Sequence, residues 1–442
     1  MRPSVTNTIE QDNNIVRQYN YKYVLGICAL FSVLLVARGV NDFFFYVFAA
    51  VSSVMFIVSN SGHCISFLFF LLPFATILKQ DIGGMSFFTV LFFLVILKLT
   101  IKLHKISVWL IVSLAALSLY CLAFSGFSEL STIITMVSGI LLLYYLRNEK
   151  LDTDINITVI VYSIGIALSS ILALFKPTLP VVDLFITESM LKLKGTEYAS
   201  RFSGLQGNPN YYTLDIIIAM AAIVVLLYNN RNTKIHTIFL VALSVFGLMS
   251  VSKSFLISWI FLIIFWLFIS IKQGVRKTVK FLIVAIFGAM VIYFFAYESI
   301  NTYLYRLLGD SSGNLESITT GRTEIWISYL NEILDNIKIL FFGNGMNTIS
   351  ETIGMGTHNT YIETLFSLGF FGTIILLVTL RISTGKIVLK QGVWIPIMVL
   401  MIRMFALGML TYDNLWFYLA IISLLTRETK QINDIEQAML GD

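Results

Sequence analysis

Charged residues are scarce in this chain. They make up 12% of its 442 residues, where a soluble domain carries roughly 25%. Hydrophobic residues make up 57%, and the mean hydropathy is +0.84. Apolar surface on this scale must face lipid as well as a protein core, so the length cannot be divided into soluble domains. The composition excludes an ordinary soluble enzyme and predicts a polytopic membrane protein.

Basic residues and cysteines are also too few for two further classes. The formal net charge is only +5, and the basic residues lie in short loops, which argues against a nucleic-acid partner. Cys28, Cys64 and Cys121 lie in apolar runs without a CxxC spacing, so we expect buried thiols and no disulfide framework. The first twenty residues are polar, and no cleavage site follows a short apolar core, so we expect the first apolar run to be a retained helix.

Apolar runs of about 15 to 20 residues recur, close to the 20 needed to cross about 30 Å of hydrocarbon. They lack the alternation of barrel strands, and a backbone in lipid must satisfy its own polar groups. The expected fold class is therefore all-α, a polytopic bundle of about 12–14 transmembrane helices. The runs lie near 21–38, 42–58, 64–78, 85–101, 107–124, 130–146, 155–175, 211–228, 236–252, 254–271, 279–297, 360–380, 392–411 and 413–426.

Lysine and arginine mark one side of the membrane, because cytoplasmic loops are enriched in them. With the N-terminus inside, the inner loops hold most of these residues and the short outer loops almost none. The pattern predicts cytoplasmic tails at 1–20 and 427–442 around a transmembrane domain at 21–426. Two long connections, 176–210 and 298–357, then lie outside, where long loops tend to carry function.

The first long outer connection ends in the polar stretch 201–210 and leads straight into a helix. Asn208 and Asn210 can cap that helix, whose positive N-terminus attracts anions. Arg201 would reach the same anion. The alternative interpretation is an ordinary capped turn with a solvated arginine.

Two further basic residues map to the same side. Lys253 lies in the short break 250–254, among three serine hydroxyls that can donate to phosphate oxygens; alternatively, it extends into the lipid headgroups. Arg322, in 320–323, offers a guanidinium suited to bidentate phosphate contacts.

The stretch 319–377 organises the C-terminal half. Gly343 and Gly345 are expected to end its first, amphipathic helix, because glycine tolerates the left-handed geometry of a helix end. His358 follows, at the start of an apolar run long enough to enter a bilayer. The apolar residues of the amphipathic helix recur at helical spacing: Trp326, Leu330, Ile333, Leu334 and Ile337.

In the predicted topology His358 maps to the outer side, together with Arg201, Lys253 and Arg322. The other three histidines map to the inner side. A hydrogen-bonded structural histidine is the alternative. If a lipid diphosphate leaves from a sugar carbon, fixed cations can neutralise it without Mg²⁺. An imidazole with a pKa near 6.5 can take the proton of the attacking hydroxyl. With no second outer histidine and no HExxH, we expect no metal site and no cofactor.

Four motifs in order resemble the bacterial O-antigen polymerase and O-antigen ligase superfamily. They are RFSGLQGNPN, SVSKS, TGRTEIW with FFGNG, and THNTYIETLFSLGFFG, between Arg201 and about Leu377. The resemblance implies an integral glycosyltransferase of the inner membrane. It would work at the periplasmic face on donor and acceptor glycans linked to undecaprenyl diphosphate.

The resemblance implies that Arg201 and Arg322 engage the diphosphate, and that His358 orients or deprotonates the acceptor hydroxyl. Lys253 stands where the family often has Ser-Arg, and a lysine keeps the charge but not the planar fork. Further substrate contacts are expected from polar residues and glycines of the motifs: Lys253, Asn208, Asn210, Asn359, Gly343 and Gly345.

Three functions stay open on the sequence. A polymerase would move a growing chain from one lipid diphosphate onto another lipid-linked unit, with a chain-length regulator and a flippase as candidate partners. A ligase would transfer finished polymer to lipid A core. A flippase or transporter of lipid-linked oligosaccharide would need charged residues inside helices, and Arg403 and Asp215 are the residues that favour it.

Overall fold

The computed structural model describes residues 20–79, 86–102, 106–148, 151, 153–185, 187–192, 198–229, 233–308, 322–346, 353–385 and 392–440. The first nineteen residues of the predicted N-terminal tail, and 309–321 and 347–352 of the second long connection, lie outside these ranges. The chain divides into two compact units. The first comprises Met1–Leu103, Asn148–Thr187 and Gly204–Asn208, and the second His104–Arg147, Glu188–Ser203 and Pro209–Asp442.

The first unit is a helical bundle whose centre is α4. Its residues are buried along the whole helix, and it packs against α8, where the hydroxyls of Ser66 and Thr158 lie 2.8 Å apart. Such a helix, apolar on every side, is typical of a bundle interior. The helices of this unit are α2 (Tyr21–Val40), α3 (Phe43–Val58), α4 (Ser61–Leu71), η1 (Leu72–Phe74), α5 (Phe87–Lys102), α8 (Ile155–Leu174), η3 (Lys176–Thr178) and η4 (Val182–Leu184).

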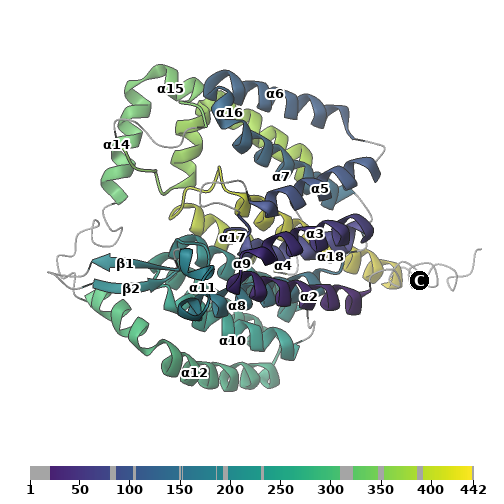
Figure 1. Ribbon diagram of the computed structural model, residues 1–442, viewed down its shortest axis with the longest axis vertical. Coiled ribbons are helices and arrows are strands. Elements are labelled where there is room, and N and C mark those ends of the chain that lie inside the picture. Colours follow the sequence, from purple (N-terminus) through teal and green to yellow (C-terminus); the bar gives the residue numbers. More distant parts are fainter. Residues whose placement is uncertain are drawn as a thin grey trace, which may run out of the picture. The chain divides into compact units, whose positions relative to one another are not determined.

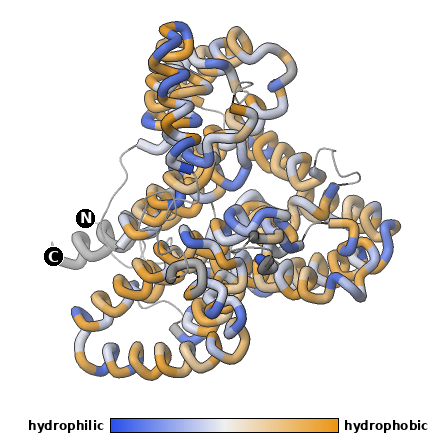
Figure 2. The backbone as a smooth tube through the Cα atoms, turned by 90° about the vertical axis from the view of Figure 1, so that its left-hand side faces the viewer, coloured by the Kyte–Doolittle hydropathy of each residue, from blue (hydrophilic) through white to orange (hydrophobic). Residues whose placement is uncertain are grey.

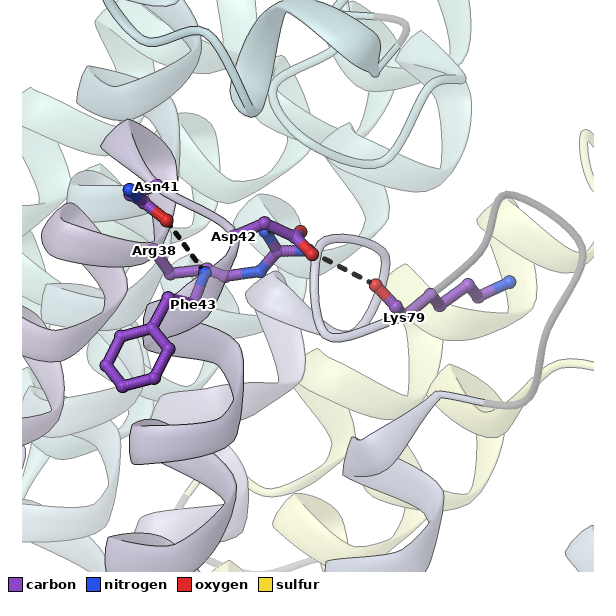
Figure 3. Close-up of polar contacts among 5 residues, drawn as sticks. All are labelled: Arg38, Asn41, Asp42, Phe43 and Lys79. Atoms are coloured by element: carbon purple, nitrogen blue, oxygen red, sulfur yellow. Dashed lines mark hydrogen bonds and ion pairs between the residues drawn. The ribbon is translucent and has the colours of Figure 1, made fainter.

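Arg38, in the last turn of α2, is a buried charge that the first unit neutralises by itself (Figure 3). It forms an ion pair with Asp42, donates to the backbone carbonyl of Lys79 at 3.4 Å, and lies over the ring of Phe45. A cation at a helix C-terminus is also favoured by the helix dipole. This arginine therefore has a nearby countercharge within the chain.

The second unit is built around α9, which is buried along most of its length and packs against α10, α11, α17 and α18. Strands β1 and β2 form an antiparallel hairpin in which Ser189 pairs with Arg201. Its elements are α6 (Val108–Ser125), η2 (Phe127–Glu129), α7 (Leu130–Asn148), β1 (Glu188–Lys192), β2 (Tyr198–Phe202), α9 (Pro209–Tyr228), α10 (Thr233–Met249), α11 (Lys253–Lys272), α12 (Val275–Leu308), α14 (Arg322–Asp335), α15 (Ile337–Phe342), α16 (Thr360–Thr384), α17 (Trp394–Met404) and α18 (Asp413–Leu440).

Eight of the described helices are long and apolar enough to cross a membrane, and four more are apolar but shorter. Hydrophobic residues occupy most positions along the helices, and hydrophilic ones gather mainly at their ends and in the connections (Figure 2). The expected all-α, polytopic membrane fold is confirmed.

In three places a helix begins or ends elsewhere than the predicted apolar run. The run near 392–411 leaves the helix at Met404, because the following residues turn back as irregular backbone whose carbonyls accept side-chain hydrogen bonds. The connection predicted at 298–357 begins inside α12, which continues to Leu308. The predicted tail at 427–442 continues α18 as a helix to Leu440.

The amphipathic segment is helical, as α14 and α15, and its buried residues are Ile333 of the predicted stripe and Tyr329, which the stripe did not include. Tyr329 and Ile333 are buried against α16, where the rings of Tyr329 and Phe366 lie 4.9 Å apart. The predicted Leu330, Leu334 and Ile337 are 39%, 67% and 72% exposed. The buried pair, Tyr329 and Ile333, is four residues apart and is shifted by one residue from the exposed pair Leu330 and Leu334. Helix α14 packs against α15 and α16, and α15 also lies beside α6 (Figure 1).

Helix α16 is interrupted at Gly369, and the turn after α15 fits this break. Gly343 ends α15 with a φ of 77°, as predicted. The N–H groups of Asn344 and Gly345 then donate to the carbonyls of Phe366 and Ser367, at 2.7 and 3.0 Å. The turn thus satisfies carbonyl groups that the break in α16 leaves without a helical partner.

We expect Gly369→Ala to lower the free energy of unfolding by about 2 kcal/mol or more. Gly369 has φ 61° and ψ −171°, which only glycine adopts readily. A Cβ there would lie 2.4 Å from the backbone nitrogen of Gly343. Thermal unfolding in detergent measures the change, and Gly356→Ala, whose Cβ would have nothing within 4 Å, is the control. Equal stability of the two variants would show that the break in α16 does not require glycine at position 369.

Candidate functional site: an arginine cluster

Hydrogen bonds in the second unit join five helix ends through the motifs that the sequence singled out. These ends are the starts of α9, α11, α14 and α16 and the end of α17. All five map to the same side in the predicted topology. Together with β2 they hold what we call the arginine cluster: Arg201, Arg322 and Arg403 with Asn210, Ser252 and Ser254.

Arg201 extends from β2 to the starts of two helices. Its Nε donates to the carbonyl of Ser250 at 3.1 Å, and its Nη2 to Oδ1 of Asn210 at 3.4 Å. The same Oδ1 accepts from Ser252 Oγ at 2.8 Å. The side chain of Arg201 is half-buried. The first two motifs, separate in the sequence, are thus joined through the amide of Asn210.

The 250–254 turn is tight and built from hydroxyls. Ser252 Oγ caps α11 by accepting from the N–H of Phe255 at 3.4 Å, and the phenol of Tyr303 donates to the Ser252 carbonyl at 3.2 Å. Lys253 is the first residue of α11 and is half-buried. The turn therefore places a lysine directly beside the partners of Arg201.

Arg403 is a member of the cluster that the sequence did not assign to it. It is fully buried, and its guanidinium donates to Ser254 Oγ at 2.6 Å, to the Asn210 carbonyl at 2.6 Å and to Thr213 Oγ1 at 2.9 Å. The available signal was an arginine inside an apolar run, which in a membrane protein points to function. The sequence alone could not say which helices it would meet.

The irregular backbone after α17 anchors the second arginine. Arg322, the first residue of α14, donates to the carbonyl of Ala406 at 2.7 Å. The next two carbonyls accept from Thr360 and Tyr211, each at 2.6 Å. The carboxylate of Glu363 accepts from the N–H of Leu410 at 3.3 Å. Elements α9, α14 and α16 thus meet on one short segment.

His358 lies in the loop just before α16. Two contacts of neighbouring residues hold that loop. Asn359 caps α16, because its Oδ1 accepts from the N–H groups of Tyr361 and Ile362 at 3.0 and 3.2 Å. The indole of Trp326 donates to the Thr357 carbonyl at 3.0 Å. The residue is exposed, yet the surrounding protein displaces enough water to lower the pKa of the imidazole, and the charge of Arg322 lowers it further. The charge of Arg322 therefore acts on the imidazole of His358.

Backbone strain marks two of these motifs. In the part of the chain that the structure describes, two residues other than glycine have a positive φ: Val251, at 49°, and His358, at 50°. Left-handed backbone is unfavourable for a side chain, and most of all for a β-branched one such as valine. Strain of this kind gathers at functional sites. It supports a functional role for both loops independently of any resemblance.

The other predicted substrate-contact residues lie at helix ends and turns. Asn208 immediately precedes α9 but groups with the first unit. Asn359 caps α16. Gly343 and Gly345 pack at the break in α16, where an added Cβ would lie 2.2 Å from the Ser367 carbonyl and 2.6 Å from the Phe124 carbonyl, respectively.

Comparison with known families gives one match. A family model described as O-antigen ligase matches residues 238–377. The matched stretch contains the 250–254 turn, Arg322, His358 and the break in α16; Arg201 and Arg403 lie outside it. No curated protein and no solved structure matches the chain.

Proposed function

The chain belongs to the superfamily of O-antigen polymerases and ligases, and from this membership we propose that it is a glycosyltransferase of the bacterial inner membrane. It joins repeat units linked to undecaprenyl diphosphate into O-antigen or a related surface polysaccharide at the periplasmic face. The arginine cluster carries the proposal, because converging guanidinium groups suit a diphosphate leaving group.

In the proposed step, the acceptor hydroxyl oxygen forms a bond to the anomeric carbon of the donor sugar. The bond from that carbon to the diphosphate oxygen breaks, and its electron pair leaves with the diphosphate. Arg201 and Arg322 stabilise the charge that develops there. The hydroxyl proton passes to His358, whose lowered pKa leaves the imidazole neutral at neutral pH and able to accept it.

The other predicted residues have supporting roles in this proposal. Lys253 adds a charge from the start of α11, where the helix dipole also favours an anion. Asn210 holds Arg201 in place through the hydrogen bond to its amide. Substrate contacts from Asn208, Asn359, Gly343 and Gly345 stay predictions. A chain-length regulator and a flippase are the proposed partners in the membrane.

Ligation to lipid A core is the second candidate, because the matching family model is described as O-antigen ligase. The polymerase and the ligase differ in the acceptor of the glycan. The glycans that remain after deletion of the gene distinguish the two functions. A core that bears a single repeat unit after deletion supports the polymerase. Loss of all repeats from the core, with polymer retained on the lipid carrier, supports the ligase.

We expect transfer of lipid-linked repeat units in vitro to continue at an unchanged rate in the presence of a metal chelator. The physical reason is that fixed arginines can neutralise the leaving diphosphate in place of Mg²⁺. The rate of polymer formation by the purified chain, with and without EDTA, measures this. A loss of activity that added Mg²⁺ restores would contradict the role given to the arginines.

A further inference from the structure

Two arginines in the described part of the chain are almost completely inaccessible to solvent, Arg38 and Arg403, at 2% and 0% exposure. They differ in how their charge is balanced. Arg38 pairs with the carboxylate of Asp42 (Figure 3). Arg403 contacts neutral oxygens, and no carboxylate within the described residues forms an ion pair with it.

A buried cation without a countercharge is unfavourable, and more so beside other cations. Arg403 shares Asn210 with Arg201, and the charge of Arg322 also acts on it. Such an arrangement is typical of sites that bind a ligand of opposite charge. An anionic ligand bound at the cluster would balance this charge, and the attraction grows with the number of negative charges that the ligand carries.

The hydrogen bonds of Arg403 also fix the geometry of the cluster. Its two terminal nitrogens hold the Asn210 carbonyl at the start of α9 and the Ser254 hydroxyl at the start of α11. The amide of Asn210 in turn accepts from Arg201 and Ser252. The orientation of Arg201 therefore depends, through one residue, on the planar fork of Arg403.

We propose that Arg403 is a positioning and specificity residue of the arginine cluster, whose buried charge makes the site prefer an isoprenoid diphosphate to the corresponding monophosphate. This inference rests on the proposed function, because it takes the cluster to be the diphosphate site. Its charge sets the preference for the more highly charged headgroup, and its fork sets the orientation of Arg201. The fork can be removed while the charge is kept, and both can be removed together.

Arg403→Met removes both charge and fork while filling a similar volume. The polar groups left behind keep other partners: Thr213 Oγ1 donates to the Pro209 carbonyl at 2.8 Å, and Ser254 Oγ lies 3.2 Å from Ser252 Oγ. The variant removes the charge of Arg403 itself and therefore leaves no unpaired ion in the protein interior. We therefore expect this variant to fold with undiminished thermal stability.

The test measures binding of farnesyl diphosphate and farnesyl monophosphate to the full chain in detergent, by ligand-dependent thermal shift at pH 8. One extra ligand charge about 10 Å from a guanidinium is favoured roughly tenfold at an effective dielectric constant of 20. The preference for diphosphate should fall by about this factor in Arg403→Met. Arg403→Lys keeps the charge and should keep the preference, while kcat for polymer formation falls and KM changes little.

Arg38→Met is the matched control, because the charge of Arg38 is already balanced by Asp42; its preference should equal that of the unmodified chain. If the unmodified chain binds neither farnesyl compound, the proposed function fails. If it prefers the diphosphate and Arg403→Met keeps that preference, the inference on Arg403 is overturned. Arg403→Gln, which keeps a donor for Ser254, serves as the neutral variant if the methionine variant does not fold.

Discussion

Replacement of Arg201 or Arg322 by glutamine is expected to abolish polymer in cells and to slow repeat-unit transfer in vitro by roughly 10² to 10³ each. The reason is that the leaving diphosphate gains charge in the transition state, and a neutral amide stabilises that charge far less than a guanidinium. Glutamine keeps a donor for the carbonyls of Ser250 and Ala406, which the two arginines contact. The loss should therefore come from charge and not from unfolding.

The measurement is the length distribution of lipid-linked polymer on a gel, together with the rate of transfer by purified protein. Arg381→Gln is the control, because Arg381 is exposed in the last turn of α16, away from the cluster. Translocation of lipid-linked units should continue in all three variants. Polymer of normal length in both Arg201→Gln and Arg322→Gln would refute the assignment of the diphosphate site.

The helices could be predicted from the sequence because the bilayer imposes one length and one composition on them. The apolar runs near 21–38, 155–175 and 211–228 correspond to α2, α8 and α9 within a few residues. Each is close to the length that crosses the hydrocarbon. The ends of helices were harder to predict where side chains elsewhere in the protein bind the backbone carbonyl groups. This happens after Met404, where the helix ends inside an apolar run.

The residues of the candidate site were predictable in type but not in their connections. Arg201, Arg322 and His358 were singled out because basic residues and histidines are few on the outer side of the predicted topology. Nothing in the sequence indicated that Asn210 would join Arg201 to Arg403, because the partners lie 9 and 193 positions away along the chain. Long-range hydrogen bonds follow from packing, which a periodic pattern does not encode.

The same limit explains why the stripe predicted in α14 included Ile333 but not Tyr329. Leu330 and Leu334 are four residues apart, as are Tyr329 and Ile333, so helical spacing alone does not choose between the two pairs. The choice between them depends on where Phe366 lies in α16. Helical spacing in the sequence predicts that α14 has an apolar face. The helix that packs against it decides which residues of that face are buried.

Arg403 had favoured a transporter, because a charge inside a membrane helix can line a passage. In the structure it holds the starts of α9 and α11 through Asn210 and Ser254. Its contacts are thus those of a residue that supports the arginine cluster. This placement favours the glycosyltransferase proposal over transport.

Replacement of His358 by asparagine is expected to lower the rate of transfer by about 10² to 10⁴, the usual contribution of a general base. Asparagine is the suitable substitute, because His358 has a φ of 50° and asparagine tolerates left-handed backbone. Thermal stability should therefore be unchanged while transfer is lost. Met355→Ala is the control, since that side chain is exposed in the same loop. Full activity of His358→Asn would refute the role of the imidazole as the base.

The pH dependence of kcat/KM also tests whether His358 is the general base, because the charge of Arg322 lowers the pKa of its imidazole. The active imidazole is neutral, so the rate should rise with pH through the pKa of His358, which lies below 6.5 because water is displaced and because Arg322 is near. Arg322→Gln removes the repelling charge, raises that pKa, and should shift the acid limb of its residual activity to higher pH. Arg322→Lys keeps the charge and should leave the limb in place. Identical limbs in the glutamine and lysine variants would show that the titrating group is not His358.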